Sequence, residues 1–364
     1  MKVAIFGCGR MGKPIAWAVE KLGCDHLILI DVSSESLQKC NSILEQDAEL
    51  RTITNPESLD LPNSLGRPYP DVVVSSLPYH KNLILAKHCI KNGIRYCDLG
   101  GNVEISNEIN DFASKFASKP VMTDIGLAPG LANILAEAFY KQIADQEDKN
   151  PETVSIMVGG IPRLYNKNDH FNYYCTWSVE GLLNEYTESC AVLENGEETT
   201  YNSLGGYTKI STKSLGDLEG FYTSGGSSHT IQRMKDLGAV NVSYRTLRWP
   251  GHAKTVDLLI NGIELDRDLL KEIFLRKCKF DNGEDCVLIY ISIDDKIQEL
   301  LIPPQGGFSA MQRSTGLPTA CGAYLLAEGN FDERKCVRYH DIDFEKFNEK
   351  MNILVGENED KNEL

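Results

Sequence analysis

The chain opens with MKVAIFGCGRMG (residues 1–12), and this stretch decides the fold. Residues 2–6 form a short, mostly apolar run that ends at a glycine, which is typical of a buried parallel β-strand. Apolar residues then recur at helical spacing over 15–22, and a second apolar run over 27–30 ends in Asp31. The motif Gly-x-Gly-x-x-Gly alone is weak evidence. Here it stands in the order strand, glycine turn, helix, strand and acid, and this order predicts a dinucleotide-binding unit of the Rossmann type.

The glycines of this turn have separate physical tasks. Gly7 allows the tight turn out of the strand, Gly9 leaves room for a pyrophosphate to approach the backbone, and Gly12 lets the helix pack close to the sheet. Free N–H groups at the helix N-terminus would then face the phosphates. We therefore expect the cofactor to contact Gly7, Gly9, Arg10, Met11 and Gly12; the alternative is a glycine loop that binds nothing.

Asp31 bears on the choice between NAD and NADP. It follows Gly12 by 19 residues, where a carboxylate accepts hydrogen bonds from the adenosine ribose hydroxyls. A 2′-phosphate about 4 Å from this carboxylate would cost up to about 4 kcal/mol per charge pair at an effective dielectric constant of about 20. Residues 32–34 supply no Arg to offset that repulsion. The sequence predicts NAD as the cofactor.

Strands and helices continue to alternate beyond residue 70. Apolar runs over 71–76, 95–98 and 120–124 predict strands, and 83–92 predicts a helix. This pattern predicts an α/β fold with a doubly wound parallel sheet, in which ligands bind beyond the carboxyl ends of the strands. One catalytic candidate, Asp124, lies at these ends. The further candidates for cofactor contact there are Leu77, Pro78, Asp98, Gly100 and Gly126. For Asp98 and Asp124, helix capping or loop solvation is the alternative.

The composition excludes several classes of partner. With 37 Lys and Arg against 52 Asp and Glu, the net charge is −15, which argues against a nucleic acid or an anionic membrane surface as partner. No apolar stretch reaches the length of a membrane span, and the first residues lack a signal-peptide pattern. The 11 cysteines form no CxxC pair, so we expect reduced thiols, no bound metal and a cytoplasmic protein.

Seven motifs occur in an order that resembles a known family. They are Gly7-x-Gly-x-x-Gly12, Asp98-Leu-Gly-Gly101, Asp124-Ile-Gly-Leu-Ala-Pro-Gly130, Val158-Gly-Gly-Ile-Pro162, Ser178-Val-Glu-Gly-Leu-Leu183, Thr223-Ser-Gly-Gly226 and Thr246-Leu-Arg-Trp-Pro-Gly-His252. Over residues 1–330 the chain resembles the saccharopine dehydrogenase-like family, and most closely its lysine 6-dehydrogenase branch. The resemblance implies a Rossmann domain, a second α+β domain and a C-terminal segment that returns to the first. It also implies a homodimer or higher homo-oligomer that uses NAD(P) at a C–N bond of a basic amino acid or polyamine.

Two features distinguish this chain within that resemblance. Saccharopine-forming members typically carry Asp, a candidate acid–base group, where this chain has Ala128, which favours the lysine 6-dehydrogenase branch. Similar enzymes usually continue Gly-Gly-Ile-Pro with a proline-rich stretch, whereas residues 163–174 contain no proline. We expect this loop to shape the pocket, which leaves the identity of the amine substrate open.

Four segments are expected from these observations. They are an NAD-binding Rossmann domain over 1–130, an α+β substrate and dimerisation domain over 131–305, a returning segment over 306–350, and an acidic, disordered tail over 351–364. Within the second domain and the segment after it, local patterns predict a hairpin at Asn195-Gly196, strands over 173–177 and 287–293, the latter at an edge or half-buried, and a helix that starts near Pro318.

An amine dehydrogenase needs a cation for the substrate carboxylate and a base for the ammonium proton. Arg248 is the first candidate for the carboxylate, and His252 is the chemically best base because its ordinary pKa is about 6.5. The alternative for an Arg is a solvated surface charge, and the alternative for His252 is a structural imidazole. Further candidates are Arg163 and Arg245 for the carboxylate, Glu180 for substrate binding, Tyr174 and His170 for acid–base chemistry, and Tyr173 and Trp177 as pocket walls unless they are core.

The leading hypothesis is oxidative deamination of the ε-amine of a basic amino acid, lysine first, with NAD. A second hypothesis is a reductive condensing dehydrogenase of the saccharopine or carboxynorspermidine type. The third belongs to another class, an NAD-binding sensor without turnover. The acidic charge of the chain favours the approach of a dibasic amine.

Overall fold

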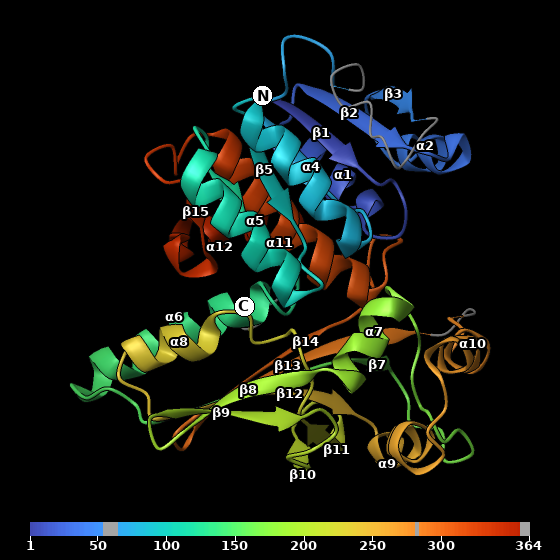
Figure 1. Cartoon of the computed structure of the whole chain (residues 1–364), viewed down its shortest axis with the longest axis vertical. Helices are drawn as coiled ribbons and strands as arrows, with labels where there is room; N and C mark the ends of the chain where they lie inside the picture. Colours follow the sequence, from blue (N-terminus) through green and yellow to red (C-terminus); the bar gives the residue numbers. More distant parts are fainter. Residues whose placement is uncertain (54–64, 281–283, 357–364) are drawn as a thin grey trace. The chain divides into compact units, whose positions relative to one another are not determined.

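The computed structural model describes residues 1–53, 65–280 and 284–356, and its contacts divide the chain into two units. Unit 1 comprises residues 1–131 and the described residues from Ser314 onward, and unit 2 comprises residues 132–313. Each unit is built around its own sheet (Figure 1). The returning segment therefore joins unit 1 from Ser314, not from residue 306 as expected.

Unit 1 is a doubly wound parallel sheet, as the sequence predicts. Among its described residues seven strands pair in the order β15-β6-β5-β4-β1-β2-β3, so the strand order reverses between β1 and β4. Helices α4 and α5 cover one face of the sheet, and α1 lies on the other (Figure 1). The elements before residue 131 are β1 (Lys2–Phe6), α1 (Gly12–Lys21), β2 (His26–Asp31), α2 (Ser34–Asn41), β3 (Glu49–Thr52), β4 (Val72–Ser75), α4 (Tyr79–Lys91), β5 (Arg95–Asp98), α5 (Val103–Phe116) and β6 (Val121–Met122).

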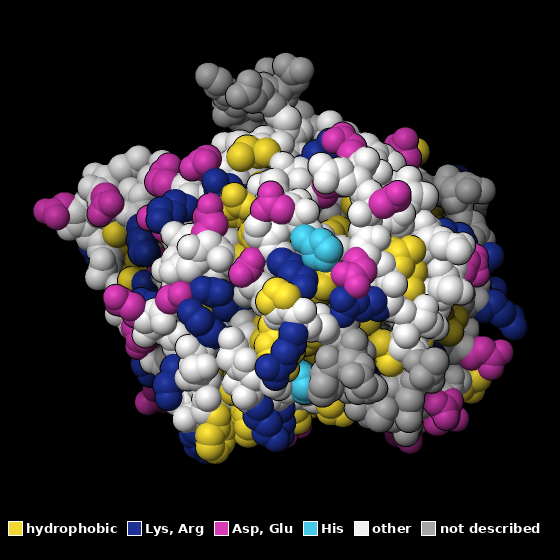
Figure 2. Space-filling model, turned by 90° about the horizontal axis from the view of Figure 1, so that it is seen from above, with side chains coloured by type: hydrophobic (Ala, Val, Ile, Leu, Met, Phe, Trp, Pro, Cys, Tyr) yellow, Lys and Arg dark blue, Asp and Glu magenta, His cyan; other side chains and the backbone are white. Residues whose placement is uncertain are grey.

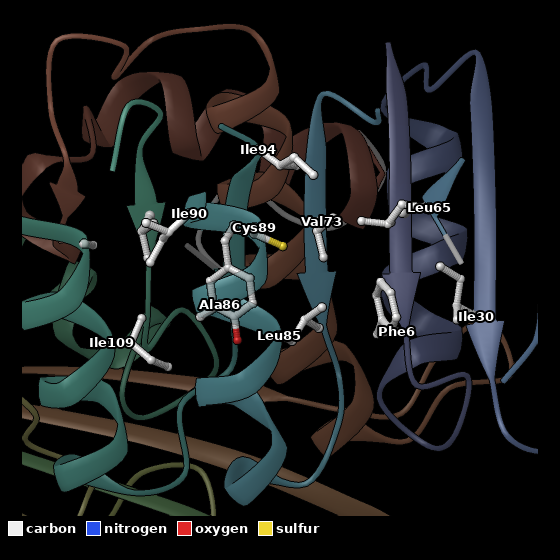
Figure 3. Packing of buried hydrophobic residues seen from close by; sticks show 14 of the residues in the cluster. Phe6, Ile30, Leu65, Val73, Leu85, Ala86, Cys89, Ile90, Ile94 and Ile109 are labelled. Carbon is white, nitrogen blue, oxygen red and sulfur yellow. The ribbon is translucent and has the colours of Figure 1, made fainter. Parts of the chain in front are cut away.

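The apolar runs of unit 1 become strands because both faces of the sheet are buried. Phe6, Ile30 and Val73 of three neighbouring strands are shielded from solvent, and Leu85 of α4 and Ile109 of α5 pack toward the same cluster (Figure 3). Burial of each such side chain stabilises the fold by about 1.5–3 kcal/mol. The carboxyl ends of β1, β2, β4, β5 and β6 are thereby held at one edge of a rigid sheet, where the candidate cofactor residues lie.

The C-terminal segment completes unit 1 with an edge strand and helices. Strand β15 (Cys336–Val337) pairs with β6, and α12 (Phe344–Val355) packs on α1. The acidic tail expected from residue 351 is therefore wrong for 351–355, which are helical because Met351 and Leu354 are buried. The rest of that expectation, residues 357–364, lies outside the described residues.

The helix expected to start near Pro318 begins earlier. Helix α11 runs over Ala310–Ala327 with Pro318 inside it. Its start is fixed by Asp285, whose carboxylate accepts hydrogen bonds from the N–H groups of Ala310 (2.8 Å) and Met311 (3.0 Å). An acceptor supplied from a distant strand is a cap that the local sequence does not reveal.

Unit 2 is a mixed sheet of eight described strands flanked by helices. Strand β7 lies at its centre between β12, which is parallel to it, and β13, which is antiparallel. The elements are α6 (Leu131–Glu147), β7 (Thr153–Pro162), α7 (Val179–Thr187), β8 (Ser189–Glu194), β9 (Glu197–Asn202), β10 (Thr208–Thr212), β11 (Gly216–Phe221), α8 (Thr230–Asp236), β12 (Asn241–Arg248), α9 (His252–Asp257), the π-helical turn η1 (Leu258–Gly262), α10 (Arg267–Lys277), β13 (Asp285–Ile293) and β14 (Lys296–Ile302).

Local predictions in unit 2 have mixed outcomes. The hairpin is confirmed, since Asn195 and Gly196 have φ values of 52° and 79° and join β8 to β9. The strand expected over 173–177 is wrong, because these residues form no ladder. The strand near 287–293 exists, but as β13 it is buried between β7 and β14 rather than at an edge.

Two searches concern residues 1–53, 65–280 and 284–356 only. No helix there is long and apolar enough to cross a membrane. No group of three or more His, Cys, Asp or Glu side chains there is placed to hold a metal ion. On the face shown in Figure 2, Lys and Arg side chains lie among Asp and Glu side chains instead of forming one basic field.

Candidate functional site

The glycine turn between β1 and α1 is tightly packed on one side and open on the other. Gly7 has a φ of 91°, and a Cβ atom on it would lie 2.6 Å from the carbonyl oxygen of Ser76. A Cβ atom on Gly12 would lie 1.9 Å from the carbonyl oxygen of Gly7. A Cβ atom on Gly9 would meet no described atom within 4 Å. The turn therefore has room for a ligand at Gly9, the position at which a pyrophosphate approaches the backbone.

Arg10 and Met11 lead from this turn into α1. Arg10 is exposed, and Met11 is the residue at the helix N-cap. The side chain of Met11 accepts no hydrogen bond from the first helical turn, in contrast to Ser33 at the start of α2. Pro14 has no N–H group, and the N–H groups of Lys13 and Ile15 donate to the carbonyls of Gly9 and Met11. The N–H groups that can face a phosphate at this helix start are therefore those of Met11 and Gly12.

Asp31 lies at the end of β2 and is held by the backbone on both sides. One carboxylate oxygen accepts the N–H of Cys8 at 2.6 Å, and the other accepts the N–H of Ser33 at 2.8 Å. Each carboxylate oxygen has a second lone pair, so the half-buried side chain can still accept a ribose hydroxyl. The first of these bonds links the acid directly to the glycine turn.

Two carboxyl groups meet at the carboxyl ends of β5 and β6. Asp98 is fully buried, and its Oδ1 accepts the N–H groups of Gly100 (2.8 Å) and Asp124 (3.2 Å). Burial, followed by the charge of Asp124, raises the pKa of Asp98 to about 7. Asp124 has a φ of 63°, and its Oδ1 accepts the hydroxyl of Ser106 at 2.7 Å. Oδ2 of Asp98 has no hydrogen-bond partner among the described residues.

The remaining unit 1 candidates shape the backbone around these groups. Gly100 has a φ of 80°, and a Cβ atom there would lie 2.5 Å from Oδ1 of Asp124. Gly126 donates its N–H to the carbonyl of Pro129 at 2.9 Å and so closes a short turn. Leu77 packs against the core, and the exposed Pro78 precedes α4.

In unit 2 the structure brings Arg248, His252 and Tyr173 together. Arg248 is 3% exposed, and its guanidinium carbon lies 4.6 Å from the centre of the Tyr173 ring. Its Nε donates to the hydroxyl of Tyr186 at 3.2 Å, and Nη1 donates to the carbonyl of Leu247 at 2.9 Å. Nε and Nη1 of Arg248 are therefore directed at groups inside the unit, which excludes the alternative of a solvated surface charge. Its role as the clamp for the substrate carboxylate stays a prediction.

His252 is a fully buried imidazole in a ring of aromatic side chains. Its Nδ1 lies 2.6 Å from the carbonyl oxygen of Phe171, which only accepts, so Nδ1 carries the proton. Its Nε2 then accepts the hydroxyl of Tyr186 at 2.9 Å. Burial, and then the charge of Arg248, lowers the pKa of His252 to about 3. The imidazole is neutral with both nitrogens used.

Glu219 fixes the helix that carries His252. This buried carboxylate accepts the N–H groups of Gly251 (2.9 Å) and Ala253 (2.6 Å) at the start of α9. A carboxylate at a helix N-terminus accepts hydrogen bonds from unpaired N–H groups and is attracted to the positive end of the helix dipole. His252 therefore has a fixed position as well as a fixed tautomer.

The other unit 2 candidates, except Trp177, lie outside this cluster. Glu180 is partly exposed and pairs with Arg267 and Lys271 of α10. Tyr174 packs on Phe280. Three further candidates are held elsewhere: Arg163 beside Cys286, Arg245 against Tyr222 and the carbonyl of Gly206, and the exposed His170 by its carbonyl bond to Thr255. Trp177 touches the cluster, because its N–H donates to the hydroxyl of Tyr173.

Three residues of this cluster are absent from the sequence-based candidates. They are Tyr186, Glu219 and Glu185, whose Oε2 lies 3.7 Å from Nη2 of Arg248. The helical spacing of Leu182, Leu183 and Tyr186 places the tyrosine on the buried face of α7, and a buried hydroxyl needs a partner. That signal could have been found in the sequence. Nothing in the sequence singles out Glu185 from the many acids of the chain.

Two family models match this chain. The model of the saccharopine dehydrogenase C-terminal domain matches residues 126–357, and that of the saccharopine dehydrogenase NADP binding domain matches residues 3–123. A curated relative, the mitochondrial alpha-aminoadipic semialdehyde synthase of Mus musculus, is 23% identical over 92% of this chain and 44% of its own length. The saccharopine dehydrogenase (NADP+, L-glutamate-forming) of Schizosaccharomyces pombe is 27% identical over 35% of this chain and 28% of its own length. The chain thus spans less than half the length of these relatives.

Solved structures share the fold. The apo saccharopine dehydrogenase (L-Glu forming) of Saccharomyces cerevisiae has a TM-score of 0.72 at 16% identity and covers 96% of both chains. The homospermidine synthase of Legionella pneumophila, solved in complex with NAD, has a TM-score of 0.71 at 13% identity and covers 98% of this chain and 90% of its own. At these identities the likeness concerns the fold alone.

Proposed function

This chain belongs to the saccharopine dehydrogenase family, and from that premise we propose that it is an NAD-dependent oxidoreductase acting on the C–N bond of a basic amino acid. The first reaction proposed is oxidation of the lysine ε-amine to the semialdehyde. The observation that carries the oxidoreductase assignment is the turn from Gly7 to Gly12 with Asp31 bound to it. This turn is closed to side chains at Gly7 and Gly12 but open at Gly9.

The residues of unit 1 fit a dinucleotide. The backbone N–H groups of Met11 and Gly12 would hold the pyrophosphate, Gly9 would leave room for it, and Asp31 would accept the ribose hydroxyls. When bound, the dinucleotide supplies the hydride acceptor. Asp31 supports NAD over NADP because a 2′-phosphate would face its carboxylate, and no Arg follows at 32–34.

The cofactor part of the proposal is tested with one variant. We expect kcat/KM with NAD to exceed that with NADP by at least about 100-fold, and Asp31→Ser to reduce this ratio by about 10-fold or more, since removal of the carboxylate removes the repulsion. Comparable kcat/KM values for the two cofactors in the wild type would contradict the NAD assignment and leave the dehydrogenase assignment standing.

The substrate part is tested by a spectrophotometric screen. NAD reduction is followed with lysine, ornithine, saccharopine and diamines, each at several pH values. Lysine should give the highest kcat/KM, and the product should carry an aldehyde that cyclises with the α-amine. Absence of amine-dependent NAD reduction across the whole panel would overturn the proposed oxidation.

A reductive condensing dehydrogenase is a second candidate because solved structures of the same fold are named as a saccharopine dehydrogenase and a homospermidine synthase. Such a reaction joins an amine to an aldehyde with NADH. Ala128 argues against it, since the resemblance places an acid–base Asp at that position in saccharopine-forming members. NADH oxidation that requires both an amine and an aldehyde, without amine-dependent NAD reduction, would favour this candidate over the first.

A further inference from the structure

Asp98 joins the two loops that follow β5 and β6 in unit 1. Its Oδ1 accepts the N–H of Gly100 in the first loop at 2.8 Å and the N–H of Asp124 in the second at 3.2 Å. Its backbone carbonyl accepts the N–H of Ile125 at 3.1 Å. Because β5 and β6 are neighbouring parallel strands, both loops lie at the carboxyl edge of the sheet. One residue at the end of β5 therefore fixes the backbone of both.

The two loops fit closely where Asp98 holds them. A Cβ atom on Gly100 would lie 2.5 Å from Oδ1 of Asp124. A Cβ atom on Gly126 would lie 3.2 Å from the carbonyl oxygen of Leu99. Asp124 has a φ of 63°, a left-handed conformation that its surroundings must hold, and its N–H bond to Asp98 is one such contact. A shift of either loop would therefore displace the other.

The order of the strands places these loops on the nicotinamide side of a bound dinucleotide. The glycine turn follows β1, and Asp31 follows β2 on one side of β1. Strands β4, β5 and β6 lie on the other side of β1. A dinucleotide with its pyrophosphate at the glycine turn and its adenosine ribose at Asp31 would extend its other half toward the carboxyl ends of β4 and β5.

The chemistry of Asp98 is poorly suited to a residue that only fills space. Its side chain is fully buried, and its Oδ2 has no hydrogen-bond partner among the described residues. Burial of a carboxyl group with one unpaired oxygen costs stability, and an apolar side chain would avoid that cost. What an apolar side chain could not do is accept the N–H groups of Gly100 and Asp124.

We propose that Asp98 is a positioning residue for the nicotinamide half of the cofactor. The inference rests on the dinucleotide part of the proposed function. Asp98 acts through the backbone of Gly100 and Asp124, which it holds at the edge of the sheet where that half of the cofactor would lie. The pyrophosphate and the adenosine ribose are assigned to the glycine turn and Asp31, so their binding does not depend on Asp98.

The test compares NAD with ADP-ribose, which lacks the nicotinamide, by calorimetric titration. Asp98→Ala removes both hydrogen bonds of Oδ1, whereas Asp98→Asn keeps an oxygen that can accept them. Asp98→Ala should weaken NAD binding by about 10-fold or more and leave the affinity for ADP-ribose within about 2-fold of the wild-type value, because only the nicotinamide half loses its preformed loops. Asp98→Asn should retain nearly all of the wild-type affinity for NAD.

Val73→Ala is the control for a general loss of stability. Val73 is fully buried in β4 of the same sheet, so this variant should lower the unfolding temperature without changing the affinity for either ligand. If Asp98→Ala does not fold, Gly100→Ala replaces it, since its methyl group would displace Asp124 and should cause the same loss for NAD alone.

The outcomes separate the role of Asp98 from the proposed function. Unchanged NAD affinity in Asp98→Ala overturns the positioning role. Equal losses of affinity for NAD and ADP-ribose also overturn it, because they show a general effect on unit 1. A wild type that binds neither ligand overturns the dinucleotide part of the proposed function, and the role of Asp98 with it.

Discussion

Asp98 is a single carboxyl group with a measurable effect on stability. Its pKa is about 7 in the folded protein and near 3.8 when unfolded, so between these values the folded state binds more protons. The free energy of unfolding therefore falls as the pH rises through this window. Relative to Asp98→Asn, which cannot ionise, the wild type should lose about 2–3 kcal/mol between pH 5 and pH 8, at about 1.4 kcal/mol per pH interval. Urea unfolding at several pH values measures this loss. If the free energy of unfolding varied with pH in the same way in the two proteins, the prediction would be contradicted.

Tyr186 is the residue whose hydroxyl joins Arg248 to His252. Tyr186→Phe keeps the ring but leaves Nε of Arg248 without its acceptor and Nε2 of His252 without its donor. Because both groups are buried, we expect the free energy of unfolding to fall by about 2–4 kcal/mol. Tyr174→Phe is the control, since its hydroxyl has no hydrogen bond within the described residues, and it should cost about 0.5 kcal/mol or less. Equal losses of unfolding free energy in the two variants, measured by urea unfolding, would contradict the role of the Tyr186 hydroxyl in joining Arg248 to His252.

At this scale the sequence predicts chemistry better than geometry. The motif 246–252 supplies Arg248 and His252, and the structure does place them together with Tyr173. Their burial could not be read from the motif, because it depends on Tyr186 and Phe171, which are distant in sequence. Burial lowers the pKa of the imidazole and so removes it from acid–base chemistry. Burial also raises the pKa of a carboxyl group toward neutrality.

At the scale of elements, the turn between β1 and α1 separates a packing role from a binding role. Gly12→Ala places a methyl group 1.9 Å from a carbonyl oxygen, so it should lower the unfolding temperature by several degrees. Gly9→Ala meets no described atom within 4 Å and should leave stability unchanged. It should nevertheless weaken NAD binding by about 10-fold or more, because its methyl group occupies the place of the pyrophosphate. Calorimetric titration with NAD, together with thermal unfolding, checks both; unchanged NAD affinity in Gly9→Ala would remove this turn from the binding site.

Elements follow from the sequence where one local signal is sufficient. The apolar run over 2–6 and the Asn195-Gly196 turn meet that condition, and both are confirmed. Residues 173–177 are predicted as a strand, but Tyr173 packs on His252 and Arg248 instead of extending a sheet. Helix α11 begins at a cap from Asp285, which only the fold brings near. These differences arise where a long-range contact outweighs a local preference.

At the scale of the whole molecule, unit 1 is assembled from both ends of the chain. The motifs that predict the dinucleotide site all lie before residue 131, yet β15 forms the edge of the same sheet. Asp332 binds Arg95 and Lys119, and the hydroxyl of Thr319 donates to the carbonyl of Ile125 at 2.7 Å. Neither pattern nor composition predicts these contacts, and only the family resemblance implies that the segment returns to unit 1.

Removal of the returning segment should therefore abolish NAD binding although every motif residue remains. A chain that ends at Arg313 lacks the buried side chains of Leu317, Leu325, Leu326 and Phe347 in unit 1. At about 1.5–3 kcal/mol for each, their loss amounts to about 6–12 kcal/mol, which is comparable to the net stability of about 5–15 kcal/mol typical of a domain. A chain that ends at Gly356 keeps every described contact and is the control. Calorimetric titration with NAD should detect binding to the longer chain only; wild-type affinity in the chain that ends at Arg313 would show that residues 1–131 form the dinucleotide site without the segment.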